Sequence, residues 1–279
     1  MLKRLAIAFL VGSFLLAVGL LYVDGHLPAS IPADAGRLDY RPLATALDHV
    51  SATGLVDYAA LKADRAGLDA FVAQLSGVSP INRPELFASA EERLAYWLNA
   101  YHALVLQAAL DEDRDAQLDA GARSFFWLRT WPIGGRRFTL WAVERRFLSD
   151  TGDSRIPFAL ACGARGCALL DGTPYQADTL DAQLNDAVSR FVQSGQNVKL
   201  EPDGVRLSPL FRTHEADIRA ALPEGRTHLL QFVWAFLPET CAERLGCDTR
   251  ADLDKACGPK LEACKVKYQP FDWQLAARR

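Results

Sequence analysis

Three residues of the sequence could carry out thiol chemistry if the fold brings them together. Cys162 ends an apolar run and is followed by a loop of small residues, 163–166. A thiol held at the start of such a loop can act as a nucleophile once a nearby base lowers its pKa. His102 is the candidate base, and Asn99, three residues earlier on the same predicted helix face, would orient it. This trio predicts a thiol-dependent hydrolase or transferase.

The same residues have a structural interpretation and a redox interpretation. Asn99 and His102 can satisfy buried backbone groups beside a helix. Cys162 can be a small buried residue, or it can form a disulfide with Cys167. Four residues separate the two cysteines, whereas a thioredoxin-like pair is separated by two. A bridge across so short a loop would be strained and reducible, which makes a thiol–disulfide redox protein the third alternative.

Four further cysteines gather in one C-terminal elaboration, residues 239–266: Cys241, Cys247, Cys257 and Cys264. Their spacings of five, nine and six intervening residues lack the short pairs of common zinc sites, so we expect two local disulfides. Three pairings are possible, and we favour the nested one, outer with outer and inner with inner. An even number of cysteines agrees with an oxidising compartment.

The N-terminal segment predicts that compartment. Lys3 and Arg4 precede Leu5–Val23, a run without charge that is nearly long enough to cross a bilayer as a helix. We therefore assign residues 1–23 to a membrane anchor or signal segment, residues 24–38 to a linker, and residues 39–279 to one globular domain. The predicted location is the inner membrane, with the domain in the periplasm, or the periplasm alone if the leader is cleaved.

Charge and motifs exclude several functions. The net charge of −3 gives no reason to expect a nucleic-acid partner. We find no phosphate-binding or dinucleotide-binding glycine loop and no G-x-S-x-G motif, so no cofactor is predicted. His214 and Asp217 can share a helix face, but two ligands do not make a metal site. The membrane is the one predicted partner, through the N-terminal helix; a protein or small-molecule partner is not identified.

Periodicity predicts the elements that position these residues. Ser89 and Glu92 form a capping box at the start of the helix that carries Asn99 and His102. Residues 156–162 predict a buried strand, and residues 134–135 and 202–204 predict hairpin turns. Further helices are expected at 42–50, from 55 through Leu75, 141–147, from 178 (with Asp178 as cap), 210–222 and 227–237. The predicted class is α+β, a helix-rich domain with a small antiparallel sheet.

Several segments, in order, resemble one family. They are residues 56–58, 96–104, 155–164, Cys167, 207–211 and 271–273. The chain is similar to the domain of unknown function 547 family, whose members have no assigned activity. Two departures are visible: Pro157 stands where the family often has His, and Gly166-Cys167-Ala168 replaces a usual Ser-Cys-Pro. Any family activity that depends on that histidine would be missing here.

The resemblance adds Glu144 and Arg155, which match family positions. They could form an ion pair that fixes the Cys162 loop, or they could bind a substrate carboxylate. An aromatic cluster, Phe125, Phe126, Trp127 and Trp131, would mark a partner surface if it is exposed. Our leading interpretation of the sequence is therefore a membrane-tethered protein with a binding or scaffolding role, ahead of the hydrolase and redox alternatives.

Overall fold

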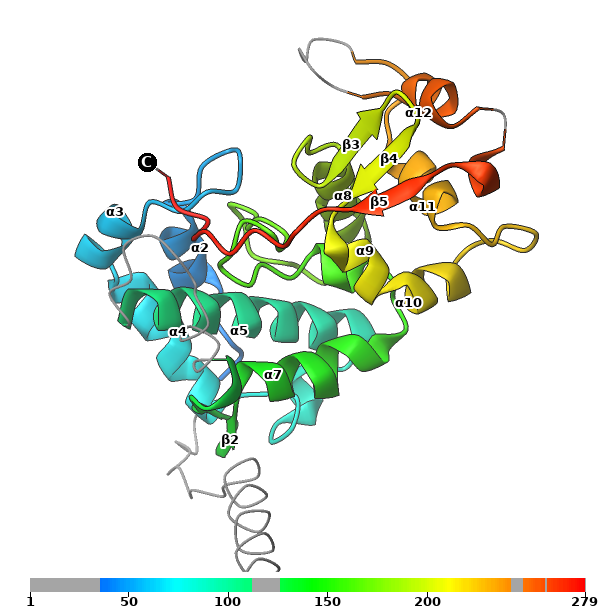
Figure 1. Ribbon diagram of the computed structural model, residues 1–279. Coiled ribbons are helices and arrows are strands. Elements are labelled where there is room, and N and C mark those ends of the chain that lie inside the picture. The colour runs from blue at the N-terminus through cyan, green and yellow to red at the C-terminus, as the bar shows by residue number, and fades with distance from the viewer. Residues whose placement is uncertain (1–35, 112–125, 242–247, 259, 279) are drawn as a thin grey trace, which may run out of the picture.

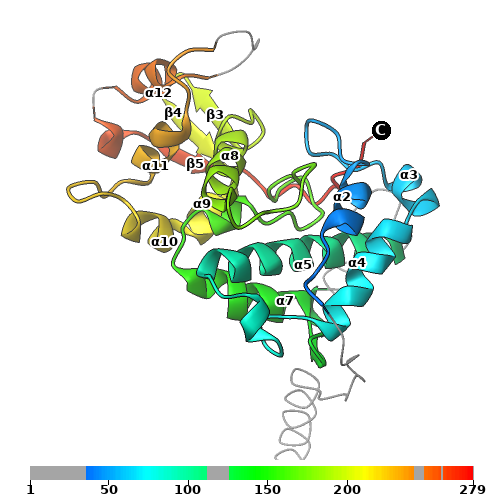
Figure 2. The same cartoon turned by 180° about the vertical axis from the view of Figure 1, so that it is seen from behind.

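The computed structural model describes residues 36–111, 126–241, 248–258 and 260–278. Two hydrophobic clusters hold them together (Figures 1 and 2). The first surrounds the long helix α5 (Ala90–Asp111), and the second lies where helix α8 (Leu180–Val192) meets a small sheet. The predicted helix-rich α+β class is confirmed. No helix among the described residues is long and apolar enough to cross a membrane, and the predicted anchor, residues 1–23, lies outside them.

Helix α5 is the centre of the first cluster. The predicted capping box is confirmed: the Glu92 N–H donates to Ser89 Oγ over 3.0 Å, and the Ser89 N–H donates to Glu92 Oε2 over 3.1 Å. Every residue from Ala95 to Leu110 is buried. Its neighbours are α4 (Ala66–Gly77), α7 (Leu140–Val143) and a π-helical turn, η2 (Glu144–Leu148). A helix packed on all sides is apolar on all sides, which explains its composition.

The helix expected from residue 55 is divided in two. Helix α3 (Tyr58–Ala63) ends at Asp64, and α4 starts at Ala66, after α2 (Arg41–Leu47) earlier in the chain. Gly67 lets α4 pack closely on α2, because a Cβ at this position would lie 2.6 Å from the Pro42 carbonyl oxygen. The predicted apolar stripe nevertheless enters the core.

The aromatic hairpin forms as predicted. Strands β1 (Trp131–Ile133) and β2 (Arg136–Phe138) pair antiparallel. Gly134 and Gly135 both have positive φ, 55° and 78°, as tight hairpin turns require. The Gly134 N–H donates to the Leu75 carbonyl oxygen over 2.8 Å, which ties the turn to the end of α4.

The second cluster contains a mixed sheet rather than the antiparallel sheet we expected. Strands β3 (Val198–Glu201) and β4 (Gly204–Leu207) form the predicted hairpin, but β5 (Val266–Tyr268) adds to β4 in parallel. The returning chain satisfies backbone groups that β4 would otherwise leave unpaired at its edge. The helices of this cluster are α8, α9 (Pro209–Thr213), α10 (Glu215–Ala220), α11 (Leu229–Phe236) and α12 (Arg250–Cys257).

The buried strand predicted at residues 156–162 is wrong. The segment forms a single 3₁₀ turn, η4 (Ile156–Phe158), followed by irregular chain. Pro157 suits the first turn of a helix, because its fixed φ and missing N–H cost nothing there. The run is apolar throughout because the two clusters bury it from opposite sides: Phe158 belongs to the second cluster, and Ile156 and Ala159 belong to the first.

The nested cysteine pairing is also wrong. Cys257 forms a disulfide with Cys264, with their Cα atoms 4.7 Å apart. The bridge links the end of α12 to a 3₁₀ turn, η5 (Leu261–Ala263), and so closes a short local loop. Cys241 is also disulfide-bonded. The prediction for Cys247 lies outside the described residues.

The capping box generates a test of the fold. Replacing Ser89 with Ala removes the acceptor for the Glu92 N–H and should lower the free energy of unfolding by about 1 kcal/mol. Urea denaturation followed by circular dichroism measures this loss. Glu92→Gln is the matched control, because glutamine can still accept from the Ser89 N–H. Equal losses in the two variants would contradict the assigned roles.

Candidate functional site

A cavity of about 280 Å³ lies between elements of the two clusters. Tyr101 of α5 and Glu144 of η2 line it, together with Leu210 of α9 and His214, which lies between α9 and α10. The remaining lining residues are Arg145, Leu148, Ser149, Gly152, Asp153, Ile156, Pro157, Leu160, Cys162, Cys167, Asp217, Ala220 and Ala221. An apolar wall with a few converging polar groups is the usual form of a small-molecule site.

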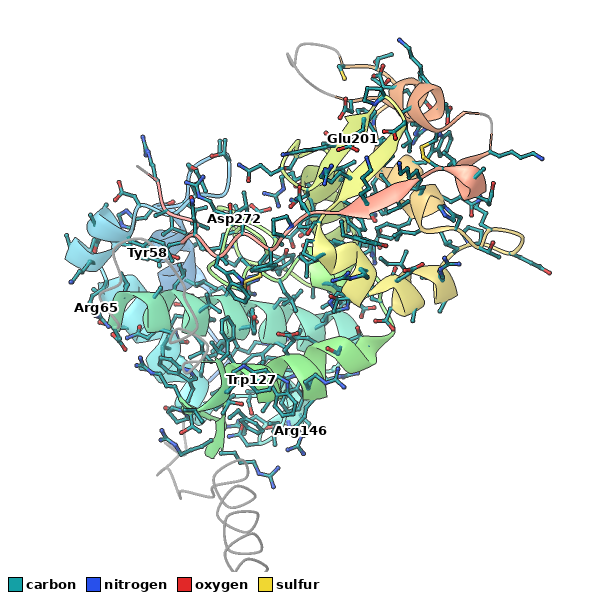
Figure 3. The ribbon with its side chains drawn as sticks, viewed as in Figure 1. Tyr58, Arg65, Trp127, Arg146, Glu201 and Asp272 are labelled. Atoms are coloured by element: carbon teal, nitrogen blue, oxygen red, sulfur yellow. A yellow bond between two sulfur atoms is a disulfide. The ribbon has the colours of Figure 1, made fainter. Side chains whose placement is uncertain are left out.

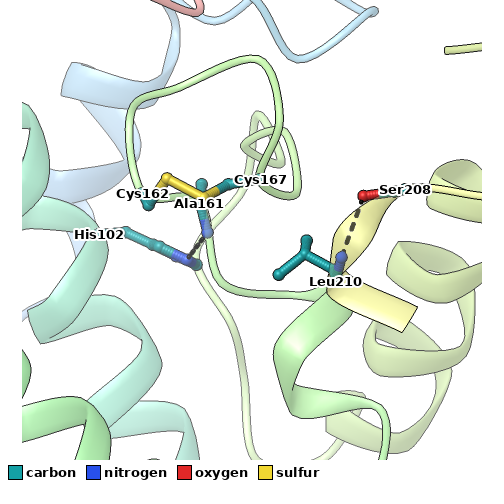
Figure 4. Close-up of a disulfide and its surroundings, with 6 residues drawn as sticks. All are labelled: His102, Ala161, Cys162, Cys167, Ser208 and Leu210. Carbon is teal, nitrogen blue, oxygen red and sulfur yellow. Dashed lines mark hydrogen bonds between the residues drawn. A yellow bond between two sulfur atoms is a disulfide. The ribbon is translucent and has the colours of Figure 1, made fainter. Parts of the chain in front are cut away.

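A disulfide between Cys162 and Cys167 forms part of that wall (Figure 4). The two Cα atoms are 5.7 Å apart. Cys162 is partly exposed, whereas Cys167 is buried, with 8 % of its surface accessible. An attacking group that enters the cavity would therefore reach Cys162 more easily than Cys167.

The C-terminal chain holds the loop between these cysteines in place. After β5 it runs back toward α2 and α3, beside the loop (Figure 1). The Arg165 N–H donates to the Gln274 carbonyl oxygen over 2.8 Å, and the Gly166 N–H donates to the Asp272 carbonyl oxygen over 2.9 Å. A Cβ at Gly166 would lie 2.9 Å from the Asp272 backbone, so only glycine permits this approach. The bridge thus sits in a fixed loop.

His102 is adjacent to the bridge, but its ring hydrogen-bonds to the backbone. Its Nε2 accepts a hydrogen bond from the Ala161 N–H over 3.2 Å (Figure 4), and the ring also hydrogen-bonds the Ala159 backbone. Burial lowers the pKa of His102 to about 4. A neutral ring with both nitrogens engaged fixes the chain just before Cys162 and does not take up a proton at neutral pH.

Asn99 also hydrogen-bonds to the backbone, and it does not orient the His102 imidazole as we expected. Its Nδ2 donates to the Tyr175 carbonyl oxygen, and its Oδ1 accepts from the Tyr175 N–H, each over 2.8 Å. Asn99 therefore pairs with one residue of the neighbouring loop as a strand would. The structure brings Cys162 and His102 together, with Asn99 turned toward a different segment.

Glu144 is the titratable group in the cavity whose environment is most unusual. Burial raises the pKa of its carboxyl, while the hydrogen bond with the Tyr101 hydroxyl opposes that rise. The side chain projects from η2, which continues α7 after the Thr139 cap accepts the Ala142 N–H. Short π-helical turns are frequent at functional sites. A carboxyl with a raised pKa holds a proton more readily than an ordinary one, which suits a group that accepts and donates protons.

Arg155 has other partners than the predicted Glu144. It forms ion pairs with Asp153 over 2.8 Å and with Asp181 over 2.7 Å, and it donates to Asn185 Oδ1. The Asp153 hydrogen bond is the largest cause of the raised pKa of Arg155. These contacts fasten η4 to the start of α8, so Arg155 acts on the bridge through the backbone.

Sequence reasoning missed Tyr101 and the cavity role of His214 and Asp217. His214 lies just before α10 as its N-cap, so the two residues do not share a helix face, but His214 Nδ1 is 3.7 Å from Asp217 Oδ2. Burial lowers the pKa of His214. No sequence signal relates α10 to η2, because the two are brought together only by packing. Within the described ranges, no group of three or more His, Cys, Asp or Glu could hold a metal ion.

Comparison with known proteins gives one match. Residues 86–192 match the model of a family described as "Protein of unknown function, DUF547". The matched region includes Tyr101, Glu144, Arg155 and both cysteines of the bridge, but not α9 and α10. Searches of the curated proteins and of the solved structures found no match.

The Asn99 contacts generate a prediction about stability. Asn99→Ala leaves one buried N–H and one buried carbonyl of Tyr175 unpaired, and should lower the free energy of unfolding by about 2–4 kcal/mol. Urea denaturation measures the change. Asn185→Ala, at an exposed position of α8, is the control and should lose far less. A loss for Asn99→Ala no larger than that of the control would contradict the structural role.

His102 generates a prediction about pH. Since its folded pKa is about 4, below the usual 6.5 of an exposed imidazole, the unfolded chain takes up a proton first as pH falls. Stability is therefore complete above pH 6.5 and is lost as pH falls toward 4, by about 2 kcal/mol between pH 7 and pH 5 from this group.

Urea denaturation at both pH values tests this prediction. His102→Gln should decline less than the wild type, although His214 and His228, whose pKa values burial also lowers, still contribute. Asn99→Ala, destabilised for another reason, should keep the wild-type pH dependence. If the free energy of unfolding of His102→Gln declines as much as that of the wild type, the His102 ring has the same pKa in the folded and unfolded states, which contradicts the prediction.

Proposed function

We propose that this chain, which is a DUF547 family protein, is a membrane-tethered extracytoplasmic protein that binds small thiols and exchanges disulfides with them at Cys162–Cys167. One observation carries the proposal: the bridge lies in the wall of a cavity that also holds a half-buried carboxyl, Glu144, whose pKa is raised. A purely structural bridge would need neither the cavity nor the Glu144 carboxyl.

The size of the cavity supports small thiols as the substrate class. About 280 Å³ is at the lower limit for pockets that enclose a small ligand. The wall near the bridge is apolar, with Pro157, Leu160 and Leu210, and an apolar wall excludes water from the reacting sulfurs. Tyr101 and Glu144 are among the polar residues of the same cavity, which also include Arg145, Ser149, Asp153, His214 and Asp217.

The exchange reaction uses the bridge as electron acceptor. A substrate thiolate attacks Cys162 Sγ, a mixed disulfide forms, the Sγ–Sγ bond breaks, and Cys167 leaves as a thiolate. A second substrate thiol attacks the substrate sulfur of the mixed disulfide and releases Cys162. Two thiols thus become one disulfide, and two electrons pass to the cysteine pair. The reverse reaction with a disulfide restores the bridge.

Glu144 would move the protons of this reaction. Only the thiolate form of the substrate attacks, so its proton must leave on entering the cavity. A carboxylate with a raised pKa can accept that proton and then return it to the departing Cys167 thiolate. The Tyr101 hydroxyl, buried and hydrogen-bonded to Glu144, would hold the carboxyl in place.

The contacts give no support to a hydrolase that uses Cys162 with His102 and Asn99. Cys162 carries no free thiol while it is bonded to Cys167, the ring nitrogens of His102 are engaged by backbone, and Asn99 pairs with Tyr175. Pro157, which stands where the family often has histidine, also lines the cavity and offers no base.

Two further observations support the compartment and the tether. Disulfides persist in oxidising compartments, and the described residues contain two complete bridges, Cys162–Cys167 and Cys257–Cys264. The charge-free run Leu5–Val23 behind two basic residues is typical of an anchor that leaves the following chain on the outer side.

The proposal is tested by equilibrating the full chain with mixtures of reduced and oxidised glutathione. Differential alkylation followed by peptide mass spectrometry measures the thiols of each cysteine pair. We expect Cys162–Cys167 to open at a potential of about −180 to −270 mV, the range of redox-active pairs. Cys257–Cys264, outside the cavity, is the internal control and should stay oxidised. If both bridges open at the same potential, or if the midpoint potential of Cys162–Cys167 lies below about −300 mV, that bridge is structural and the proposal is wrong.

The rate of bridge reduction by glutathione tests the role of Glu144. Glu144→Gln should slow it about ten-fold or more near neutral pH and remove one inflection from its pH profile. Asp153→Asn is the control, since Asp153 lines the cavity but pairs with Arg155. Equal pH profiles in Glu144→Gln and the wild type would exclude the proton transfer.

A further inference from the structure

An exposed aromatic surface lies near the hairpin β1–β2. Trp127, Leu128 and Trp141 have exposed fractions of 53 %, 67 % and 38 %, and the two indole rings are 5.1 Å apart. Of the aromatic cluster expected from the sequence, Trp131 is buried, Phe126 is half-buried, and Phe125 lies outside the described residues. Two adjacent exposed indoles form a continuous apolar surface that needs a partner.

The chain around these indoles is strongly basic. Residues 126–148 contain five arginines and one acidic residue, Glu144, in a protein whose net charge is −3. Glu144 and Arg145 line the cavity, whereas Arg136 and Arg146 are exposed and do not line it. Arg145 follows Trp141 by one helical turn. This segment therefore combines indole rings with guanidinium groups, and its one carboxyl, Glu144, lines the cavity.

Figure 3 shows how this surface lies in the molecule. Trp127 and Arg146 are on the side of the hairpin β1–β2, and Asp272 and Glu201 are on the opposite side. The other large exposed indole, Trp273, is next to Asp272 and packs on Phe271 with ring centroids 4.4 Å apart. Exposed tryptophans thus occur on two sides of the described part of the chain.

We propose that Trp127, Leu128, Trp141 and the flanking arginines dock on an anionic lipid surface. Indoles favour the boundary between lipid headgroups and acyl chains, and each basic residue near anionic headgroups adds to the attraction. A linker of residues 24–38 spans at most about 50 Å, so the membrane would lie within reach. This proposal rests on the proposed function only for that tether; the thiol chemistry plays no part in it.

Tryptophan quenching by brominated lipid tests the proposal. The full chain is reconstituted into vesicles of phosphatidylcholine, alone or mixed with phosphatidylglycerol, in which part of the lipid carries brominated acyl chains. We expect more quenching in the anionic vesicles, and a fall of about half when Trp127→Ser and Trp141→Ser are combined. Trp273→Ser is the matched control and should leave the lipid-dependent quenching unchanged.

A second variant tests the charge. Arg136→Gln with Arg146→Gln keeps every indole, and should abolish the difference between anionic and neutral vesicles. Equal quenching in the wild type and the Trp127/Trp141 variant would overturn the proposal, as would equal quenching in both lipids. Shielding of these indoles from aqueous iodide without any lipid quenching would indicate a protein partner and would also overturn it.

The same samples separate this proposal from the proposed function. Bridge reduction by glutathione is measured in each variant, because Trp127 and Trp141 do not line the cavity. Reduced docking with unchanged exchange supports the surface alone and shows that the variant is folded. Docking that persists in a protein whose bridge does not exchange would overturn only the thiol chemistry.

Discussion

The site depends on one segment that two hydrophobic clusters bury from opposite sides. Phe158 packs its ring against three phenylalanines of the second cluster, with centroids 4.9–5.4 Å apart. Ile156 and Ala159 lie in the first cluster. Such a segment cannot shift relative to either cluster without exposing apolar surface or opening a void. Since Cys162 follows directly, its position relative to both walls of the cavity is set by this packing.

Polar side chains beside that segment hydrogen-bond to backbone groups, and they take no part in the proposed chemistry of the cavity. His102 receives the Ala161 N–H, and Asn99 pairs with Tyr175. Buried backbone groups must find partners when no regular strand supplies them, and irregular chain on both sides of the bridge creates that need. Glu144 is instead held by a side chain, Tyr101, and so keeps a carboxyl that can exchange a proton with a ligand.

The short helix α7 and its continuation η2 contribute to both proposed sites. Glu144 lines the cavity beside the bridge, while Trp141 of the same helical segment is exposed and its ring lies next to that of Trp127. Helical geometry separates these side chains onto different faces within a few residues. Docking through the outer face would therefore fix the orientation of the cavity relative to a lipid surface, and the bridge with it.

Features that depend on local periodicity and local hydrogen bonds could be predicted from the amino-acid sequence alone. The capping box at Ser89, the glycine turn of β1–β2 and the hairpin β3–β4 all follow from residues close together in the chain. Tertiary structure decided the rest. An apolar run such as 156–162 has the same composition whether it is a strand or a turn between two clusters, and only the packing of distant helices distinguishes them. The partners of Cys257 and Arg155, and the meeting of η2 with α10, were decided in the same way, by the path of the chain through space.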